Sequence, residues 1–318
     1  MQEFIITEDF PKNQLEFDAR FTNEQACHDY LFRCKWPDGF QCKNCGHSHY
    51  WKSARGLYIC THCEQHHSLT ADTIFHGTRK ALTVWFKAMW WFTTRRTGIS
   101  ALSLKNLLGL TYETAWTWLH KLRSCTIRKE REKLSGEVEV DEIYIGGHHS
   151  GKRGRGSENK CSVMVAVERD GTHLGRLRLA VVENCSAQDL QSFIKDHIAP
   201  QSSVFTDGWK GYNGLEELLY RHKKVMPANA TDKASVLPGV HLVASLLKRL
   251  ILGTYQGRME KKYLQNYLNE YVFRFNRRTS KSVGKCFYRI VQQSMSSLRI
   301  TRKQIAKGNA LLGQEMLT

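Results

Sequence analysis

Residues 138–147 read VEVDEIYIGG, a pattern typical of a buried β-strand with acidic residues in its middle. Val138 and Val140 are at even positions, which point to one face of the expected strand, and Ile143 and Ile145 are at odd positions, which point to the other. Such a change of phase indicates either a β-bulge or a strand that is buried on both faces.

Further strands and a helix follow this segment in an order that limits the fold. Residues 161–168 and 175–183 are strand-like, and an Asp-Gly pair between them is typical of a hairpin turn. A capping box begins a helix at Ser186, and a short strand ends just before Asp207. The order strand, strand, strand, helix, strand, then further helices predicts an α/β RNase H-like domain.

Two aspartates occupy positions in this order that suit metal binding. Asp141 lies in the middle of the first apolar strand, where a carboxylate is unfavourable unless it is paired or bound to a metal. Asp207 lies at the end of the fourth strand. These are the positions at which an RNase H-like fold places two metal-binding aspartates, so the sequence predicts a catalytic metal site. A hydrogen-bonded structural role is the alternative for each residue.

A third ligand is expected on a later helix, GVHLVASLLKRLILG at residues 239–253, which contains no acidic residue. His241 and Lys248 are seven residues apart, close to two helical turns, so their side chains share a face. At that spacing a histidine can hold a metal ion and a lysine can contact a phosphate, whereas a lone helical histidine is normally a surface or core residue. The competing ligands are Glu142, Glu216, Glu217 and Asp232.

Four of the ten cysteines form two CxxC pairs, Cys42–Cys45 and Cys60–Cys63, with 14 residues between the pairs. This spacing predicts a zinc ribbon. Four thiolates complete a tetrahedral shell, so the expected zinc ion is structural. Two disulfides are the alternative, but cytosolic thiols stay reduced and nothing in the sequence indicates export.

A pair of short amphipathic helices is predicted between the ribbon and the first long strand. Ser100 can cap a helix that Gly109 ends, and a second helix runs from about residue 112 to residue 128. Two such helices indicate a helix-turn-helix, whose second helix enters the major groove of DNA, although any αα-hairpin gives the same pattern. The expected DNA contacts on that helix are Thr114, Thr117 and Lys121.

Charge and hydropathy limit the binding partners and the cellular location that the sequence allows. The 318 residues carry a net charge of +17, and residues 1–33 have seven acids and three bases, so the rest of the chain carries +21. Such an asymmetry favours nucleic acid as the partner, with a solvated basic surface as the alternative. No apolar run approaches the roughly 18–20 residues that cross a bilayer, and the acidic N-terminus is unlike a signal peptide. We therefore expect a cytoplasmic protein with no membrane partner.

The chain resembles bacterial insertion-sequence transposases of the ISXO type over roughly residues 30–280. Besides the two CxxC pairs, the resemblance rests on SLTADTIFHGTRKALTVWFKAMWW (68–91), GISALSLKNLLGL (98–110), TAWTWLHKLR (114–123), VEVDEIYIGG (138–147), TDGWKGY (206–212), SLLKRLILGTYQG (245–257) and YLNEYVFRFNRR (267–278). It implies a multidomain α+β protein. We place the zinc ribbon within residues 1–75, the helical DNA-binding region at 76–133, an RNase H-like DDE transposase domain at 134–280 and a basic tail at 281–318.

The resemblance also implies roles for site residues. The aspartates of VEVDE and TDGW, Asp141 and Asp207, correspond to the first two catalytic acids. Members with a third Glu have it seven residues before the lysine of SLLKR, and here that position is His241, a replacement that the family allows. We therefore expect Asp141, Asp207 and His241 to hold the catalytic ions, while Lys248 and the neighbouring Arg249 contact DNA phosphates.

The implied reaction is DNA cleavage followed by strand transfer, with two Mg²⁺ or Mn²⁺ ions bound at the carboxylates. The implied partner is double-stranded DNA, both the terminal inverted repeats of the element and the target, bound by a homodimer or higher oligomer in the nucleoid of a bacterium. Two alternatives remain: a catalytically inactive DNA-binding regulator derived from a transposase, and a metal nuclease that does not join strands.

Overall fold

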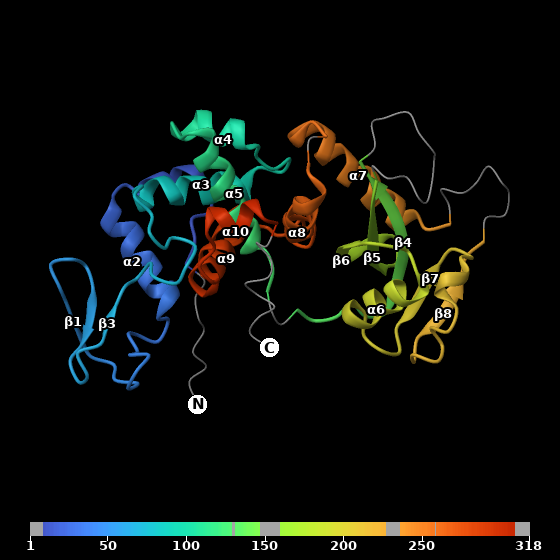
Figure 1. Cartoon of the computed structure of the whole chain (residues 1–318), viewed down its shortest axis with the longest axis horizontal. Helices are drawn as coiled ribbons and strands as arrows, with labels where there is room; N and C mark the ends of the chain where they lie inside the picture. The colour runs from blue at the N-terminus through green and yellow to red at the C-terminus, as the bar shows by residue number, and fades with distance from the viewer. Residues whose placement is uncertain (1–8, 129–130, 147–159, 227–235, 258, 309–318) are drawn as a thin grey trace. The chain divides into compact units, whose positions relative to one another are not determined.

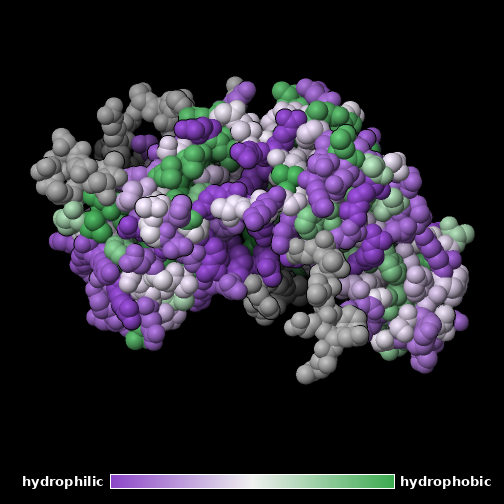
Figure 2. Space-filling view, turned by 180° about the vertical axis from the view of Figure 1, so that it is seen from behind, coloured by the Kyte–Doolittle hydropathy of each residue, from purple (hydrophilic) through white to green (hydrophobic). Residues whose placement is uncertain are grey.

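The computed structural model describes residues 9–128, 131–146, 160–226, 236–257 and 259–308 (Figure 1). The chain forms two compact units, one made of residues 1–128 together with 279–318 and the other of residues 129–278. Among the described residues, no helix has the length and apolar character needed to cross a membrane. On the face drawn in Figure 2, hydrophilic residues predominate and apolar residues form patches between them.

The first unit consists of helices and a small antiparallel sheet. Side chains at the N-caps accept hydrogen bonds from backbone N–H groups in five of its helices, α1, α2, α4, α5 and α10, as helix starts require. Its elements are α1 (Gln14–Arg20), α2 (Glu24–Lys35), β1 (Tyr50–Lys52), β2 (Tyr58–Cys60), β3 (His66–His67), α3 (Leu82–Thr94), α4 (Ala101–Leu108), α5 (Tyr112–Ser124), α9 (Val283–Ser296) and α10 (Arg302–Ala306).

The C-terminal segment differs from the basic tail that the sequence predicts. Helix α9 packs against α2 and α3, and Phe287 is fully buried among aromatic rings that include Phe17 and Phe86. Gly284 lies so close to Pro11 that a Cβ atom would overlap the Pro11 carbonyl oxygen. The segment contains many bases, but its apolar residues follow a helical period, so it completes the core of the first unit.

The second unit is built on a five-stranded sheet. Its strand order is β6-β5-β4-β7-β8, with β4, β5 and β6 antiparallel and with β7 and β8 parallel to β4. This arrangement is the RNase H-like topology, so the predicted fold class is confirmed. Its elements are β4 (Glu137–Ile145), β5 (Cys161–Asp170), β6 (His173–Val182), α6 (Ala187–His197), β7 (Ser203–Thr206), η1 (Lys210–Tyr212), β8 (Arg221–Lys224), α7 (Pro238–Tyr255), η3 (Lys261–Tyr263) and α8 (Leu264–Phe275).

Strand β4 is buried on both faces of this sheet. Val138 and Val140 pack in one core with α6, whereas Ile143 and Ile145 pack in another with α7 and α8. Figure 1 shows α6 and α7 on opposite sides of the sheet. Pairing with β5 continues without a register shift along the whole of β4, so the change of phase reflects burial on two sides and not a bulge.

Helix α8 and the residues after it bind the outer edge of β6. Asn276 exchanges two hydrogen bonds with the backbone of Leu177. Gln265 accepts one from the Val181 N–H and donates one to the Leu179 carbonyl. Side-chain amides therefore satisfy backbone groups that an edge strand would otherwise leave unpaired.

Candidate metal sites and nucleic-acid interface

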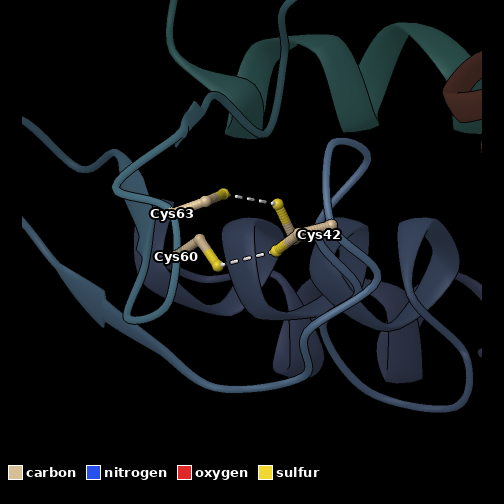
Figure 3. A group of neighbouring side chains, drawn as sticks. Cys42, Cys60 and Cys63 are labelled. Atoms are coloured by element: carbon tan, nitrogen blue, oxygen red, sulfur yellow. Dashed lines mark hydrogen bonds between the residues drawn. The ribbon is translucent and has the colours of Figure 1, made fainter.

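The four cysteines of the two CxxC pairs meet in the first unit. All four sulfur atoms lie within 4.8 Å of one another, with 3.5 Å between the Sγ atoms of Cys42 and Cys63 and 3.6 Å between those of Cys45 and Cys60. Figure 3 shows the thiols turned toward one another. Sulfur atoms about 2.3 Å from a tetrahedral zinc ion are about 3.8 Å apart, so the cluster fits zinc. These separations are well beyond the roughly 2.05 Å of a disulfide.

Turns and hydrogen bonds surround the cluster. Gly46, with φ +72°, ends the first turn and its N–H donates to the Cys42 carbonyl. The backbone N–H of Gln65, followed by the side chain of Asn44, lowers the pKa of Cys63 to about 6. The buried ring of His67 places Nε2 3.3 Å from the Cys42 sulfur. Such outer contacts orient metal ligands, and the sequence analysis assigned no such role to His67.

Asp141 and Asp207 come from neighbouring parallel strands. The register pairs Glu137 with Ser203 and Glu139 with Phe205, and Asp141 and Asp207 each follow the last of these pairs by two residues. Both aspartates are half-buried. Asp141 accepts a hydrogen bond from the Glu142 N–H at 2.8 Å, and Asp207 accepts one from the Trp209 N–H at 3.0 Å. The two carboxylates predicted from the sequence therefore lie near the C-terminal end of β7, Asp141 in the middle of β4 and Asp207 just after β7.

A buried tyrosine lies beside these carboxylates. The Tyr212 side chain is fully buried, and its O–H donates to Glu142 Oε2 at 3.3 Å. Burial, followed by the negative charges of Glu142, Asp141 and Asp207, raises the pKa of Tyr212 well above its usual value. The sequence analysis treated Glu142 only as a competing ligand and assigned no role to Tyr212, although both residues lie within quoted motifs.

His241 and Lys248 lie on α7 and both are exposed. Their spacing places both side chains along one edge of the buried face of α7. Leu246 and Leu250 lie along the other edge of that face. Among the described residues, only the four cysteines bring three or more metal-binding side chains together. His241 therefore does not complete a closed ligand set with the two aspartates in this conformation.

The competing ligands do not complete such a set either. Glu216 and Glu217 are exposed, and the Glu216 carboxylate lies 3.4 Å from Nδ1 of His222. Asp232 lies outside the described residues.

A buried glutamate fixes the start of α7. The Glu139 side chain is fully buried, and its Oε2 accepts a hydrogen bond from the Val240 N–H at 2.9 Å. Arg169 Nε lies 3.3 Å from Oε1 of the same carboxylate. A carboxylate at a helix N-terminus satisfies free N–H groups and complements the helix dipole. The Glu139 carboxylate therefore holds the turn of α7 that carries His241 against β4. Glu139 is two residues before Asp141, so both side chains lie on the same face of the sheet.

Two family models match the chain, one in each unit. Residues 133–276 match the model of the ISXO2-like transposase domain, and residues 22–66 match that of the transposase zinc-ribbon domain. The chain belongs to this transposase family. The prediction of a transposase is thereby confirmed, and the alternative of an inactive regulator is not favoured.

Other relatives of the transposase are distant. It is 24% identical over 218 residues to an uncharacterized protein in transposable element ISH50 of Halobacterium salinarum, with 62% of this chain and 71% of that protein aligned. A chain of a simian T-cell lymphotropic virus intasome has a TM-score of 0.31 and 16% identity, covering 54% of this chain and 63% of that one. The Mos1 strand transfer complex has a TM-score of 0.28 and 14% identity, covering 67% of this chain and 73% of that one.

The helical region of the transposase lies between the two matched segments. Helices α4 and α5 pack together across Gly109, which has φ +61°, and Thr111 caps α5. The two predicted helices and the turn at Gly109 are therefore present, and their role in DNA binding stays a prediction. Among the described residues of its second helix, Tyr112 is the most exposed aromatic, at 54%.

Three of the predicted DNA-contacting residues lie on α5, and they are only partly exposed. The hydroxyl of Thr114 is 2.8 Å from that of Thr111, and Thr117 is half-buried. The Lys121 ammonium donates to the Ile74 carbonyl at 2.8 Å, and burial lowers its pKa. Lys121 is therefore a structural contact of the transposase in this conformation.

The fourth predicted DNA contact, Arg249, lies on α7 and is exposed.

Proposed function

We propose that this transposase cleaves DNA at the ends of its element and joins them to target DNA, using Asp141 and Asp207 as the catalytic carboxylates. The observation that supports the proposal is the parallel register of β4 and β7, which, continued by two residues, brings Asp141 in the middle of β4 beside Asp207 just after β7. Paired carboxylate oxygens are the ligands that Mg²⁺ and Mn²⁺ prefer. Bound ions would supply charge stabilisation for in-line phosphoryl transfer.

Residues around the aspartates orient the site and the DNA. Glu139 holds the first turn of α7 on β4, so His241 remains on the same face as Asp141. Lys248 and Arg249, both exposed on α7, are suited to contact phosphates of the bound strands. We assign His241 as a third metal ligand, which requires its side chain to approach the aspartates when ions and DNA bind.

DNA recognition is assigned to the first unit. We assign the N-terminal half of α5, with Tyr112, Thr114 and Thr117, to the major groove, as in other helix-turn-helix proteins. Lys121 is excluded from this role because its ammonium is used internally. We propose that the transposase acts as a homodimer or higher oligomer on its inverted repeats, in the bacterial cytoplasm and in association with the nucleoid.

A supercoiled plasmid that carries the element ends tests the reaction. With Mg²⁺ or Mn²⁺, the parent should give both cut and joined products, whereas Asp141→Asn and Asp207→Asn should reduce both by about a hundredfold or more. Asp196→Asn, at an exposed position of α6, is the matched control and should behave like the parent. Nicks without joining would indicate a nuclease, and binding without cutting would indicate a regulator.

His241 requires its own comparison. Neutral imidazole suits Mn²⁺ better than Mg²⁺, so His241→Glu should retain activity and use Mg²⁺ better, while His241→Ala should lose most activity. Electron paramagnetic resonance of bound Mn²⁺ gives a readout independent of turnover, and His241→Ala should bind the ion more weakly. Parental activity and parental Mn²⁺ binding in His241→Ala would remove His241 from the site and leave Glu142 as the next ligand to test.

A further inference from the structure

A polar hollow of about 320 Å³ lies beside the zinc ribbon, within the first unit. This volume is at the small end of the roughly 300–1,000 Å³ of ligand sites. Its base includes the buried residues Trp36 and His67 and the half-buried Lys35, while exposed polar side chains form its rim. The rim residues are Lys43, Asn44, Gln65, His66 and Asp72.

The charge of the hollow is unusual. The Lys35 ammonium donates to the carbonyls of Ser68 and Leu69, both at 2.8 Å, which uses two of its three N–H groups. Among the described residues, no carboxylate lies within ion-pairing distance of Lys35 or Lys43. Burial, followed by the charge of Lys43, lowers the pKa of Lys35 to about 8, and the charge of Asp72 acts in the opposite direction. A half-buried cation that forms no ion pair is stabilised when an anion binds beside it.

Residues next to the zinc-binding cysteines form one wall of the same hollow. Lys43 and Asn44 are the two residues between the ligands Cys42 and Cys45, and His67 contacts the Cys42 sulfur at 3.3 Å. No Asp or Glu occurs between Asp38 and Glu64, so the zinc-bound thiolates are the negative groups of this stretch, whose other charged side chains are basic. Asp72 is the one carboxylate on the rim.

We propose that this hollow binds one phosphate group of the DNA backbone, with Lys35 and Lys43 supplying the charge and Asn44 and His66 supplying hydrogen-bond donors. The inference rests on the proposed function, because it assigns a position on the ribbon to the DNA that the transposase acts on. Zinc fixes the wall that carries Lys43, so phosphate binding at the hollow requires the intact cluster.

Binding of fluorescent duplex DNA to the full, zinc-loaded chain tests the hollow. Lys43→Gln should lower the affinity about three- to tenfold and reduce the slope of log affinity against log salt by about one, as expected when one phosphate contact is lost. Lys43→Arg should remain close to the parent. The matched control is Lys52→Gln on β1, an exposed lysine of the same ribbon that does not line the hollow, and it should change affinity less than twofold.

A titration with inorganic phosphate separates the hollow from the function. NMR signals of the Lys35 and His66 side chains should shift and saturate with millimolar phosphate, and Lys43→Gln should abolish that response while zinc content stays at one per chain. Equal losses of DNA affinity in Lys43→Gln and Lys52→Gln, with no saturable phosphate response, would contradict phosphate binding at the hollow. The proposal that the transposase binds DNA would still hold. A saturable phosphate response in a chain that binds no duplex would support a phosphate site at the hollow. It would contradict the proposal that this site binds the DNA backbone.

Discussion

The zinc ribbon and the carboxylate site of the sheet are assembled in different ways. The four cysteines lie within 22 consecutive residues, Cys42 to Cys63, and their sulfur atoms converge within 4.8 Å. Asp141, Asp207 and His241 span about a hundred residues and depend on a parallel strand pairing and on a helix held by Glu139. One site is fixed by local turns, whereas the other is fixed by tertiary packing. The second should therefore be sensitive to residues that bind no metal.

Loss of one cysteine should give the largest effect, because the small ribbon depends on its ion. Structural zinc contributes on the order of 10 kcal/mol to the folding of such modules. Cys42→Ser should reduce zinc from one ion per chain to none and unfold the ribbon, while the second unit stays folded. Elemental analysis and limited proteolysis measure both outcomes.

Cys185→Ser is the control for that change, since Cys185 lies outside the cluster and should leave the zinc content unaltered. A ribbon that keeps its fold and its zinc with three cysteines would mean that another residue of the region replaces the lost ligand.

Substitution of Glu139 should show how far the second site depends on packing. Glu139→Gln removes a buried charge that faces both Arg169 and the N-terminus of α7, and should destabilise the second unit by about 3 kcal/mol. Chemical denaturation of the full chain measures the change. Strand cleavage should also fall, although no proposed metal ligand is altered.

Glu137→Gln is the matched control on the same strand. Glu137 is exposed and lies 4.0 Å from Lys223, so its loss should change stability by less than about 0.5 kcal/mol. If the two variants were equally stable, α7 would not depend on the Glu139 carboxylate.

A smaller, pH-dependent effect is expected from His120 in the first unit. This side chain is fully buried, and burial, followed by the charge of Arg123, lowers its pKa to about 2. The unfolded chain takes up a proton below about pH 6.5 while the folded chain does not, so stability falls as the pH drops through that value. The loss should be about 2 kcal/mol between pH 7 and pH 5.

His120→Gln should remove this contribution, and the measurement is the difference in pH slope between parent and variant. Zinc release in acid affects both proteins alike and cancels in that difference. Identical slopes would show that His120 takes up its proton in the folded state.

Much of the fold follows from local patterns. The alternation in residues 138–147, the Asp-Gly turn and the capping box at Ser186 specify elements by short-range chemistry, and their order leaves one topology. The cysteine cluster is predictable for the same reason. Net charge alone does not show the apolar face of α9, and the aromatic core of the first unit shows where its Phe287 packs.

The candidate site is less accessible to sequence reasoning. The strand positions of Asp141 and Asp207 could be inferred, because strand order and register determine them. The internal contact of Lys121 with Ile74 depends on a segment 47 residues away. The cap by Glu139 and the bond from Tyr212 to Glu142 each join residues 70 or more positions apart, and no local pattern marks them.

The amides of Gln265 and Asn276 have a consequence for assembly. They occupy the backbone groups along the outer side of β6, so a strand from another molecule cannot extend the sheet there. The opposite edge, β8, presents the exposed cations Arg221, Lys223 and Lys224, which repel a second copy of themselves. Copies of this domain that meet on DNA must therefore recognise one another through side chains rather than through a shared sheet.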